Sequence, residues 1–321
     1  MKRNYLKSLK IKIYDEVYEE IGNSRVHYFD YPMHYNIGDL LIFLGTEEFF
    51  KDKNVNVVGR YTLYEGRSSW IRHKIHKDDV IVFHGGGNFG DIYDSCQMLR
   101  EFIIKKFPNN KIVILPQSVH FNSESRYLES KVIHSRHNNL VIFVRDKFSS
   151  EKVSDFGKVK LMPDMAHCLL ESRFINEVKI RARTTSKYGN VYLTRTDEEK
   201  LTIFSGEGHY TMADWFDFID NKTETRRKIF NVLLRTLGRY VDLSSYVSKQ
   251  WYFNANQVAY IGGDYLLSGE MVTSDRLHAM IFCELLGQKI HMFDNFYKKN
   301  SRYYQEWLNA SELISWSKND K

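Results

Sequence analysis

Arg276 and His278 stand two positions apart, where a short apolar run gives way to a helical pattern. The run Met271–Thr273 predicts a strand, and the apolar spacing over Arg276–Leu286 predicts a helix. The first N–H groups of a helix and its dipole favour a bound anion, and a guanidinium and an imidazole add donors at the same point. We therefore expect Arg276 and His278, with Ser274 just before them, to bind a phosphate or a carboxylate. A polar pair that merely stabilises the start of the helix is the alternative.

Three consecutive glycines follow a second apolar run, Val80–Phe83, in the sequence His84-Gly85-Gly86-Gly87-Asn88. Glycine permits backbone conformations that bring N–H groups close to a ligand. The spacing matches neither the dinucleotide-binding fingerprint nor the Walker loop. We predict a ligand-facing loop that includes Gly86, Gly87 and Asn88, with a tight packing turn as the alternative.

Polar and charged side chains also follow the other predicted strands. Their positions are Asn36 and Asp39, Gln117 and His120, Arg145, Arg195, and the neighbouring lysines Lys298 and Lys299. An arginine in such a place can hold a carboxylate or a phosphate through two parallel hydrogen bonds. Pairing of Arg145 with Asp146 at a helix start is a serious alternative. His120 could donate a proton, although an isolated histidine in a polar loop is more often only solvated.

The elements that must position these side chains alternate along the chain. Strands are predicted at 25–31, 54–58, 80–83, 111–115, 140–144, 190–194, 271–273 and 289–293, and helices at 37–51, 93–107, 123–137, 147–155, 224–241, 256–267 and 276–286. Such alternation predicts parallel strands with crossover helices. Ligands of such sheets bind beyond the carboxyl ends of the strands.

We predict an α/β protein of two Rossmann-like domains that face each other across a cleft. The length of 321 residues suits two domains. The first is expected over residues 1–170 and the second over residues 171–300, with a basic linker at Lys179–Tyr188. Residues 301–321 form a C-terminal tail of helical character, which we expect to pack back on the first domain.

The composition excludes several classes of protein. With 43% hydrophobic and 27% charged residues, the chain is globular rather than disordered. Three widely spaced cysteines argue against a disulfide framework and a cysteine zinc site, so we expect a cytoplasmic protein. The histidines and acidic residues show no tight ligand spacing, so we expect no metal. No apolar run approaches the roughly 20 residues of a membrane span. The net charge of +6 suits an anionic ligand or surface, but no nucleic-acid recognition motif appears.

Taken in order, the motifs resemble those of the polysaccharide pyruvyl transferase family. The matching set lies between about residues 30 and 300 and comprises Asn36/Gly38/Asp39, Gly85-Gly86-Gly87, Pro116-Gln117-Ser118, Val144-Arg145-Asp146, Pro163-Asp164 and Ser274-Asp275-Arg276-Leu277-His278-Ala279. The resemblance implies a two-domain fold like that of the GT-B glycosyltransferases. It also implies transfer of pyruvate from phosphoenolpyruvate to a nucleotide-linked or lipid-linked sugar of a bacterial exopolysaccharide or capsule precursor. The product is a cyclic pyruvate ketal, and no cofactor is needed.

The resemblance implies roles for the candidate residues. Arg145 and Arg276 would clamp the anionic donor, and His278 would bind its phosphate or supply the proton that ketal formation requires. The expected donor site also includes Ser274, Gly86, Gly87 and a lysine after the last strand, either Lys299 or its neighbour Lys298. The expected acceptor site comprises Asn36, Asp39, Asn88, Gln117, His120 and Arg195.

Two other functions fit parts of the sequence. A nucleotide-sugar glycosyltransferase of the same architecture would use an acidic residue of the second domain to hold a ribose, and Glu270 and Glu284 are available. A non-catalytic protein of polysaccharide assembly would have no need of Arg145, Arg276 and His278 together. Binding of phosphoenolpyruvate rather than a nucleoside diphosphate sugar distinguishes the first of these from a pyruvyl transferase.

The segment Thr225–Val241 has two interpretations. On a helix, one apolar stripe would comprise Phe230, Leu233, Leu234, Leu237 and Val241, with a basic flank of Arg226, Arg227, Lys228, Arg235 and Arg239. The first interpretation is a core helix with a solvated basic face. The second is a helix whose basic flank rests on anionic lipid at the inner face of the cytoplasmic membrane, where it would bring the cleft to a lipid-linked sugar.

Overall fold

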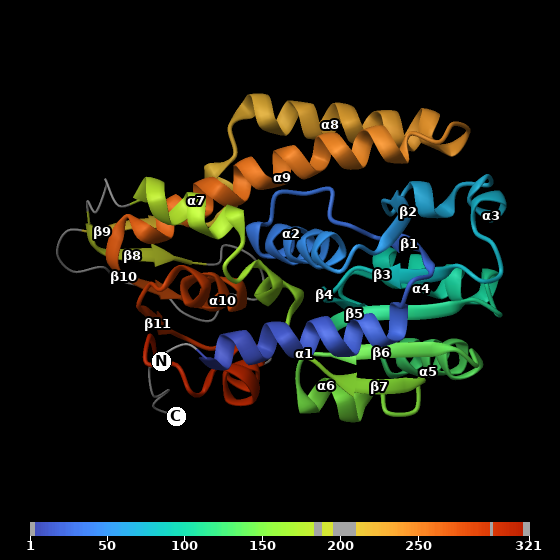
Figure 1. The fold of residues 1–321 in the computed structure, drawn as a ribbon, viewed down its shortest axis with the longest axis horizontal. Coiled ribbons are helices and arrows are strands. Elements are labelled where there is room, and N and C mark those ends of the chain that lie inside the picture. The colour runs from blue at the N-terminus through green and yellow to red at the C-terminus, as the bar shows by residue number, and fades with distance from the viewer. Residues whose placement is uncertain (1–3, 183–187, 195–209, 296–297, 317–321) are drawn as a thin grey trace.

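Two parallel β-sheets, each with its own helices, form the molecule (Figure 1). The structure is a computed structural model, and it describes residues 4–182, 188–194, 210–295 and 298–316. Every strand pair within the described residues is parallel. The predicted strands and helices are all present, and the α/β class with Rossmann-like alternation is confirmed.

The first sheet contains seven strands in the described part of the chain, in the order β2-β1-β3-β5-β6-β7, with β4 beside β5. Their bounds are β1 (Arg25–Phe29), β2 (Asn56–Tyr61), β3 (Val80–Phe83), β4 (Gly86–Gly90), β5 (Lys111–His120), β6 (Leu140–Val144) and β7 (Lys158–Leu161). β3 pairs with the first half of β5 and β4 with the second half. The glycine segment, predicted as a loop, is therefore partly a strand.

The second sheet has the order β12-β11-β10-β8-β9. Its strands are β8 (Tyr188–Leu193), β9 (Tyr210–Ala213), β10 (Gly269–Ser274), β11 (Ile290–Met292) and β12 (Ile314–Trp316). The C-terminal tail is helical over α11 (Lys299–Tyr303) and a π-helical turn at Tyr304–Leu308, and then joins this sheet as β12. The same tail contacts the first half, because Trp307 Nε1 donates to Arg145 O over 2.7 Å.

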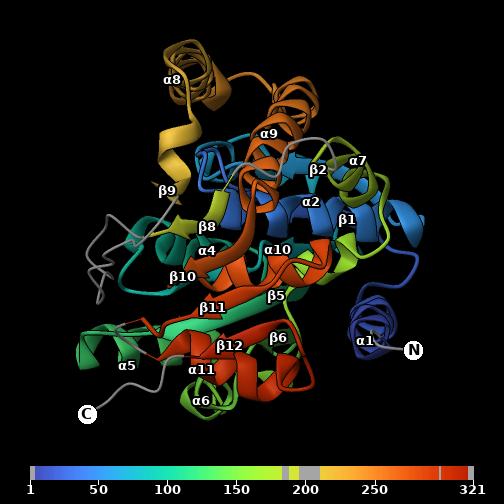
Figure 2. The ribbon, with the colours of Figure 1, turned by 90° about the vertical axis from the view of Figure 1, so that its left-hand side faces the viewer.

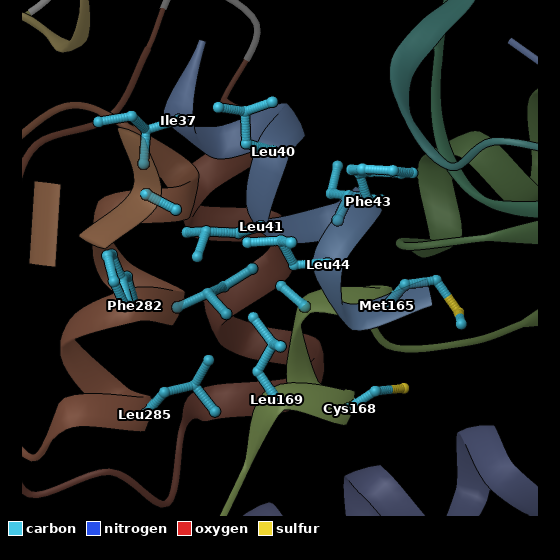
Figure 3. Packing of buried hydrophobic residues seen from close by; sticks show 14 of the residues in the cluster. Ile37, Leu40, Leu41, Phe43, Leu44, Met165, Cys168, Leu169, Phe282 and Leu285 are labelled. Atoms are coloured by element: carbon cyan, nitrogen blue, oxygen red, sulfur yellow. The ribbon is translucent and has the colours of Figure 1, made fainter. Parts of the chain in front are cut away.

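Helix α2 (Ile37–Asp52) lies at the centre of the core. Its residues are apolar on nearly every side because other elements of both halves cover them, including α10 (Leu277–Leu286) and a 3₁₀ turn at Met165–Leu169. Figure 3 shows Leu41 and Leu44 of α2 gathered with Phe282 of α10 and Leu169 of the turn. This packing joins the two halves of the chain.

The remaining helices cover the sheets. They are α1 (Asn4–Ile21), α3 (Ile71–Lys74), α4 (Asp94–Lys106), α5 (Glu124–Ser135), α6 (Lys147–Lys152), α7 (Arg173–Ala182), α8 (Asn221–Thr236) and α9 (Ser244–Leu267). Helices α8 and α9 form a long hairpin that reaches back over the first half (Figures 1 and 2). The rings of Tyr35 and Trp251 stack there with centroids 5.1 Å apart. None of the helices in the described ranges is long and apolar enough to cross a lipid bilayer.

The expected linker at Lys179–Tyr188 is wrong in its first part. Helix α7 continues through Ala182, because its apolar residues Ile175 and Val178 are fully buried and hold the helix against the core. The rest of the expected linker lies outside the described residues as far as residue 187, and Tyr188 already begins β8.

Candidate functional site

A cavity of about 590 Å³ lies at the carboxyl ends of strands from both sheets. Residues that directly follow a strand line it: Asp30 follows β1, His84 follows β3, and Arg145 follows β6. From the second sheet, Arg276 comes two residues after β10. This is the position at which open α/β sheets bind ligands.

Two helices begin at this cavity. The side chain of Asn36 caps α2 by accepting a hydrogen bond from Gly38 N over 3.0 Å, and Arg276 stands just before the first residue of α10. Asn36 and Asp39 at one helix start, and Arg276 and His278 at the other, all line the cavity. Because helix N-termini carry partial positive charge, both contribute a field that favours an anion.

Gly38 allows the two helix starts to meet. A β-carbon at this position would stand 2.5 Å from His278 Nδ1, closer than real contacts allow. The His278 imidazole therefore lies directly against the first turn of α2. The glycine of the Asn36/Gly38/Asp39 motif is required here for close approach of another side chain.

Asp164 joins two of the predicted catalytic residues. Its Oδ2 accepts from Arg145 Nη1 over 2.6 Å and lies 3.3 Å from His278 Nε2, and its Oδ1 accepts from Ala166 N over 2.9 Å. Burial alone would raise the pKa of this carboxyl, but the charges and hydrogen bonds of His278 and Arg145 outweigh it and hold the pKa well below its usual range. A buried carboxylate thus positions a guanidinium from one half and an imidazole from the other.

The Arg145 guanidinium is buried and fixed on several sides. Ser118 Oγ accepts from Nε over 3.2 Å and from Nη2 over 2.9 Å, in addition to the ion pair with Asp164. Gly87 lies across from it, and a β-carbon there would stand 3.8 Å from Nη2. The alternative pairing of Arg145 with Asp146 is not formed, because Asp146 instead caps α6 by accepting from Ser149 N.

Arg276 is held in the same manner by a second carboxylate. It forms an ion pair with Asp214, which follows β9, and both side chains are buried. Ser274 Oγ accepts from Arg276 N over 3.1 Å and donates to Leu193 O over 2.7 Å, so it shapes the turn into α10. Lys299 completes the cationic side of the cavity.

A second polar network in the cavity surrounds Asn88. Its Nδ2 donates to Asp30 Oδ2 over 3.1 Å, and its Oδ1 accepts from Arg100 Nη2 over 2.8 Å and from Gln117 Nε2 over 2.9 Å. Burial raises the pKa of Asp30 to about 6, although Arg100 and Asn88 act in the other direction. A carboxyl with a pKa near neutrality in a cavity has the properties of a general acid or base.

The structure brings together most of the predicted site residues. The cavity is lined by Arg145, Arg276, His278, Lys299, Gly87, Asn36, Asp39 and Asn88. Of the two neighbouring lysines, Lys299 reaches the cavity wall, while Lys298 adopts a left-handed conformation before α11. Arg195 lies outside the described residues.

Other predicted residues lie beside the cavity or away from it. Ser274, Gly86 and Gln117 support lining residues without being among them, and Gln117 also donates to His84 O over 2.7 Å. His120 lies away from the cavity because β5 does not end at Leu115 as predicted. The strand continues for three residues beyond Gln117, which places His120 about 10 Å further along. There the imidazole lies 3.0 Å from Asn122 Oδ1. Glu284 contacts Tyr5 and Ser311 instead of the cavity.

Several lining residues were not predicted as site residues. His84 begins the glycine segment, its Nδ1 lies 2.6 Å from Tyr28 Oη, and burial lowers its pKa to about 4, so the imidazole is neutral at pH 7. Arg227, Asn231 and Arg235 come from α8, which no strand-end rule could place in the cavity. His84 directly follows the apolar run Val80–Phe83, so that rule could have found it. Asp30 fell inside the strand predicted at 25–31, whereas β1 ends at Phe29. Among the described residues, no group of three His, Cys, Asp or Glu side chains is arranged to hold a metal ion.

Two parallel sheets with a polar cavity at their carboxyl ends define an α/β protein with the architecture of a ligand-binding enzyme. Residues 36–295 match the family model of the polysaccharide pyruvyl transferases, and the chain belongs to that family, which confirms the resemblance of its motifs. Membership in this family makes the chain a transferase.

Individual relatives agree with this membership. EpsO of Bacillus subtilis strain 168, which carries the name of a pyruvyl transferase, is 31% identical over 294 residues, or 89% of this chain and 86% of EpsO. Pyruvyl transferase 1 of Schizosaccharomyces pombe is 28% identical over 308 residues, or 91% of this chain and 72% of that protein. The crystal structure of an uncharacterised Klebsiella pneumoniae protein superposes with a TM-score of 0.63 at 18% identity, over 96% of this chain and 98% of that one, and this likeness supports the fold alone.

Proposed function

We propose that this protein transfers pyruvate from phosphoenolpyruvate to a sugar of a bacterial surface polysaccharide precursor, forming a cyclic ketal and releasing phosphate. One observation carries the proposal: Arg145, Arg276, His278 and Lys299 come from both halves of the chain and meet in one cavity at two helix starts. Phosphoenolpyruvate carries a phosphate and a carboxylate, so it calls for several fixed cations. Family membership and the names of EpsO and of the Schizosaccharomyces pombe relative support the transfer of a pyruvyl group.

The donor would lie between the two buried arginines. A buried cation without a partner is strongly destabilising, so each buried arginine needs a carboxylate beside it. Asp164 and Asp214 fill this need and hold the guanidinium groups in place before any donor arrives. Preorganised charge of this kind stabilises a transition state without reorganisation cost. Each half of the chain supplies one arginine, as a GT-B-like arrangement of two domains about a cleft would require.

The reaction needs one proton donor and one proton acceptor. A proton added to C3 of the donor makes C2 electrophilic, and the oxygen of a first sugar hydroxyl then bonds to C2 and loses its proton. The bond from C2 to the phosphate oxygen breaks, and a second hydroxyl oxygen closes the ring while its proton leaves with the phosphate. We assign the proton donor to His278, which lines the cavity beside Arg145 and Arg276, and the acceptor of the first hydroxyl proton to Asp30, which also lines it.

Incubation of the protein with phosphoenolpyruvate and candidate nucleotide-linked or lipid-linked sugars tests this function. We expect phosphate release that depends on the acceptor, and an acceptor whose mass increases by one pyruvic acid less one water. The variant Arg276→Lys keeps the charge and the pair with Asp214 but loses the planar fork, so turnover should fall while the fold remains. Release of a nucleoside diphosphate from a nucleotide sugar, with no consumption of phosphoenolpyruvate, would identify a glycosyltransferase instead.

A further inference from the structure

One face of helix α8 leaves a row of apolar side chains uncovered. Of the stripe that the sequence offered as core, only Leu234 is fully buried, whereas Leu233, Leu237 and Val241 are exposed. Ile229 and Val232 of the same helix are 54% and 59% exposed. We call Ile229, Val232 and Leu233, together with Leu237 of the 3₁₀ turn that directly follows α8, the α8 outer face. Contiguous apolar surface of this kind marks a site of interaction.

Basic side chains border the α8 outer face. Arg226, Lys228 and Arg239 are all exposed. Between residues 221 and 241 the sequence has a single acidic residue, Glu224, and Arg227 Nε donates to its carboxylate over 2.8 Å. A helix with an aliphatic row and a basic border is typical of a helix that lies in the interface of an anionic bilayer.

The position of α8 suits a surface contact. Figures 1 and 2 both place α8 at the outer edge of the molecule, with α9 between it and α2. The other side of the same helix faces inward, where Arg227, Asn231 and Arg235 line the cavity. A surface that held the α8 outer face would therefore lie within one helix diameter, about 10 Å, of the cavity wall.

We infer that the α8 outer face docks on an anionic lipid bilayer and that the cavity thereby receives a sugar attached to a membrane lipid. The exposed aliphatic side chains would enter the acyl boundary, while the flanking arginines and lysine would contact anionic headgroups. The first part stands on the exposed residues and their charges. The second part, delivery of a lipid-linked sugar, rests on the proposed function.

Vesicle cosedimentation of the full chain tests the docking without any turnover. Wild type should pellet with vesicles that contain phosphatidylglycerol, remain in solution with pure phosphatidylcholine, and be released when ionic strength rises from about 0.1 M to about 1 M. Two variants should weaken binding: Ile229→Ser with Val232→Ser by at least tenfold, and Arg226→Gln with Lys228→Gln by about 30-fold, the equivalent of about 1 kcal/mol for each charge. None of these four residues lines the cavity.

Matched controls distinguish this face from the surface in general. Leu128→Ser with Val132→Ser removes two comparably exposed aliphatic side chains from α5, and Lys105→Gln with Arg136→Gln removes two exposed charges elsewhere. Both controls should bind vesicles as wild type does. Phosphate release with phosphoenolpyruvate and a water-soluble acceptor should be equal in all five proteins.

The outcomes separate the docking from the proposed function. Pelleting that is absent, equal with both lipids, or unchanged by both α8 variants overturns the docking, even if the protein consumes phosphoenolpyruvate. Gel filtration gives a further test: a wild-type dimer that Ile229→Ser with Val232→Ser converts to a monomer would make the face a contact between copies and overturn the lipid assignment. Lipid binding without any use of phosphoenolpyruvate would leave the docking in place and refute the proposed function.

Discussion

The imidazole of His278 occupies the space that a side chain at Gly38 would need. The two residues belong to different halves of the chain, and the position of a β-carbon on Gly38 is 2.5 Å from His278 Nδ1. The Nε2 of the same ring lies 3.3 Å from Asp164 Oδ2. The start of α2 and a buried carboxylate therefore hold the ring from two sides, and its orientation depends on how the halves pack.

The variant Gly38→Ala should displace this ring. We expect a loss of about 1–3 kcal/mol in the free energy of unfolding from overpacking, and a fall of roughly 100-fold in kcat/KM with phosphoenolpyruvate, because a displacement of about 1 Å is enough for such a loss. Denaturant unfolding and steady-state kinetics measure the two effects.

A double-mutant cycle with His278→Ala is the control for Gly38→Ala. Once the imidazole is absent, only the β-carbon of residue 278 remains near an alanine at position 38, at 3.1 Å, so Gly38→Ala should destabilise this background much less than it destabilises wild type. The helix propensity of alanine, which exceeds that of glycine by about 1 kcal/mol, offsets part of the remaining cost. Equal destabilisation by Gly38→Ala in the presence and absence of His278 would contradict this contact.

The variant Asp164→Asn tests how one carboxylate supports two cationic groups. It leaves the buried Arg145 guanidinium without its ion partner, so we expect a loss of about 3–5 kcal/mol in the free energy of unfolding at pH 7. The double variant Asp164→Asn with Arg145→Met removes both charges and should recover much of this loss. No recovery in the double variant would show that the pair does not account for the stability.

The acid side of the stability profile gives the sign of the Asp164 contribution. The pKa of the folded protein's Asp164 lies below its ordinary value of about 3.9, so the pair stabilises the protein above that pH and loses its effect as pH falls through the lower, folded value. Between about pH 5 and pH 2, wild type should therefore lose more stability than the double variant. If urea unfolding shows that wild type and the double variant lose stability in parallel over this pH range, Asp164 does not have a lowered pKa in the folded protein.

The sequence predicted the parts of the site that follow strongly apolar strands. Arg145 and Arg276 were found in this way because Leu140–Val144 and Met271–Thr273 are recognisable without tertiary information. Asp164 appeared only as part of a motif, since it follows β7, whose lysines at positions 158 and 160 hide the strand pattern. Asp214 was missed because β9, Tyr-Thr-Met-Ala, is only four residues long and has no run of large aliphatic side chains.

The features that the sequence could not predict depend on packing between distant segments of the chain. The polar end of β5 could not be predicted as a strand, because it exists only through pairing with β4, and this pairing carries His120 away from the cavity. The apolar spacing of α8 correctly predicted a helix, but it could not show which side of the helix the α9 hairpin covers. The sequence pattern placed Leu237 in the core stripe, whereas the structure leaves it 52% exposed.

The proposed role of Asp30 predicts a specific pH dependence. A general base must be ionised, and burial raises the pKa of Asp30 to about 6, so kcat/KM should rise with pH through about pH 6. Asp30→Asn should lower kcat/KM by roughly 10²–10⁴-fold and remove this rising limb. Asp39→Asn, at another residue of the cavity wall, is the matched control and should keep the limb. A rising limb that persists in Asp30→Asn would assign the base to another group.

The buried carboxyl of Glu65 predicts that stability falls as pH rises, the reverse of the Asp164 effect. Its side chain is fully buried, Oε2 accepts from Thr62 N over 3.2 Å and from Thr62 Oγ1 over 3.1 Å, and Oε1 has no hydrogen-bond partner among the described residues. Burial raises its pKa to about 7, and the nearby Asp242 adds to the effect. A β-carbon on Gly238, in the turn between α8 and α9, would stand 3.8 Å from Glu65 Cγ, so this turn packs against the Glu65 side chain. Ionisation of the carboxyl therefore acts on the contact between the hairpin and the first half.

The raised pKa of Glu65 determines whether stability rises or falls with pH, and the variant Glu65→Gln tests this direction. Between about pH 4.3 and pH 7 the unfolded chain releases a proton that the folded protein keeps, so the free energy of unfolding falls as pH rises through this window, by about 3 kcal/mol from this group. Glu65→Gln carries no such proton. The free energy of unfolding of the variant, minus that of wild type, should therefore increase by about this amount from pH 4.5 to pH 8. Any constant cost of the buried amide cancels in that comparison. Glu124→Gln, at an exposed position, should follow the wild-type profile. If Glu65→Gln and wild type lose stability in parallel over this range in urea titrations, the carboxyl is ionised in the folded protein at pH 5 and the hairpin contact does not depend on its proton.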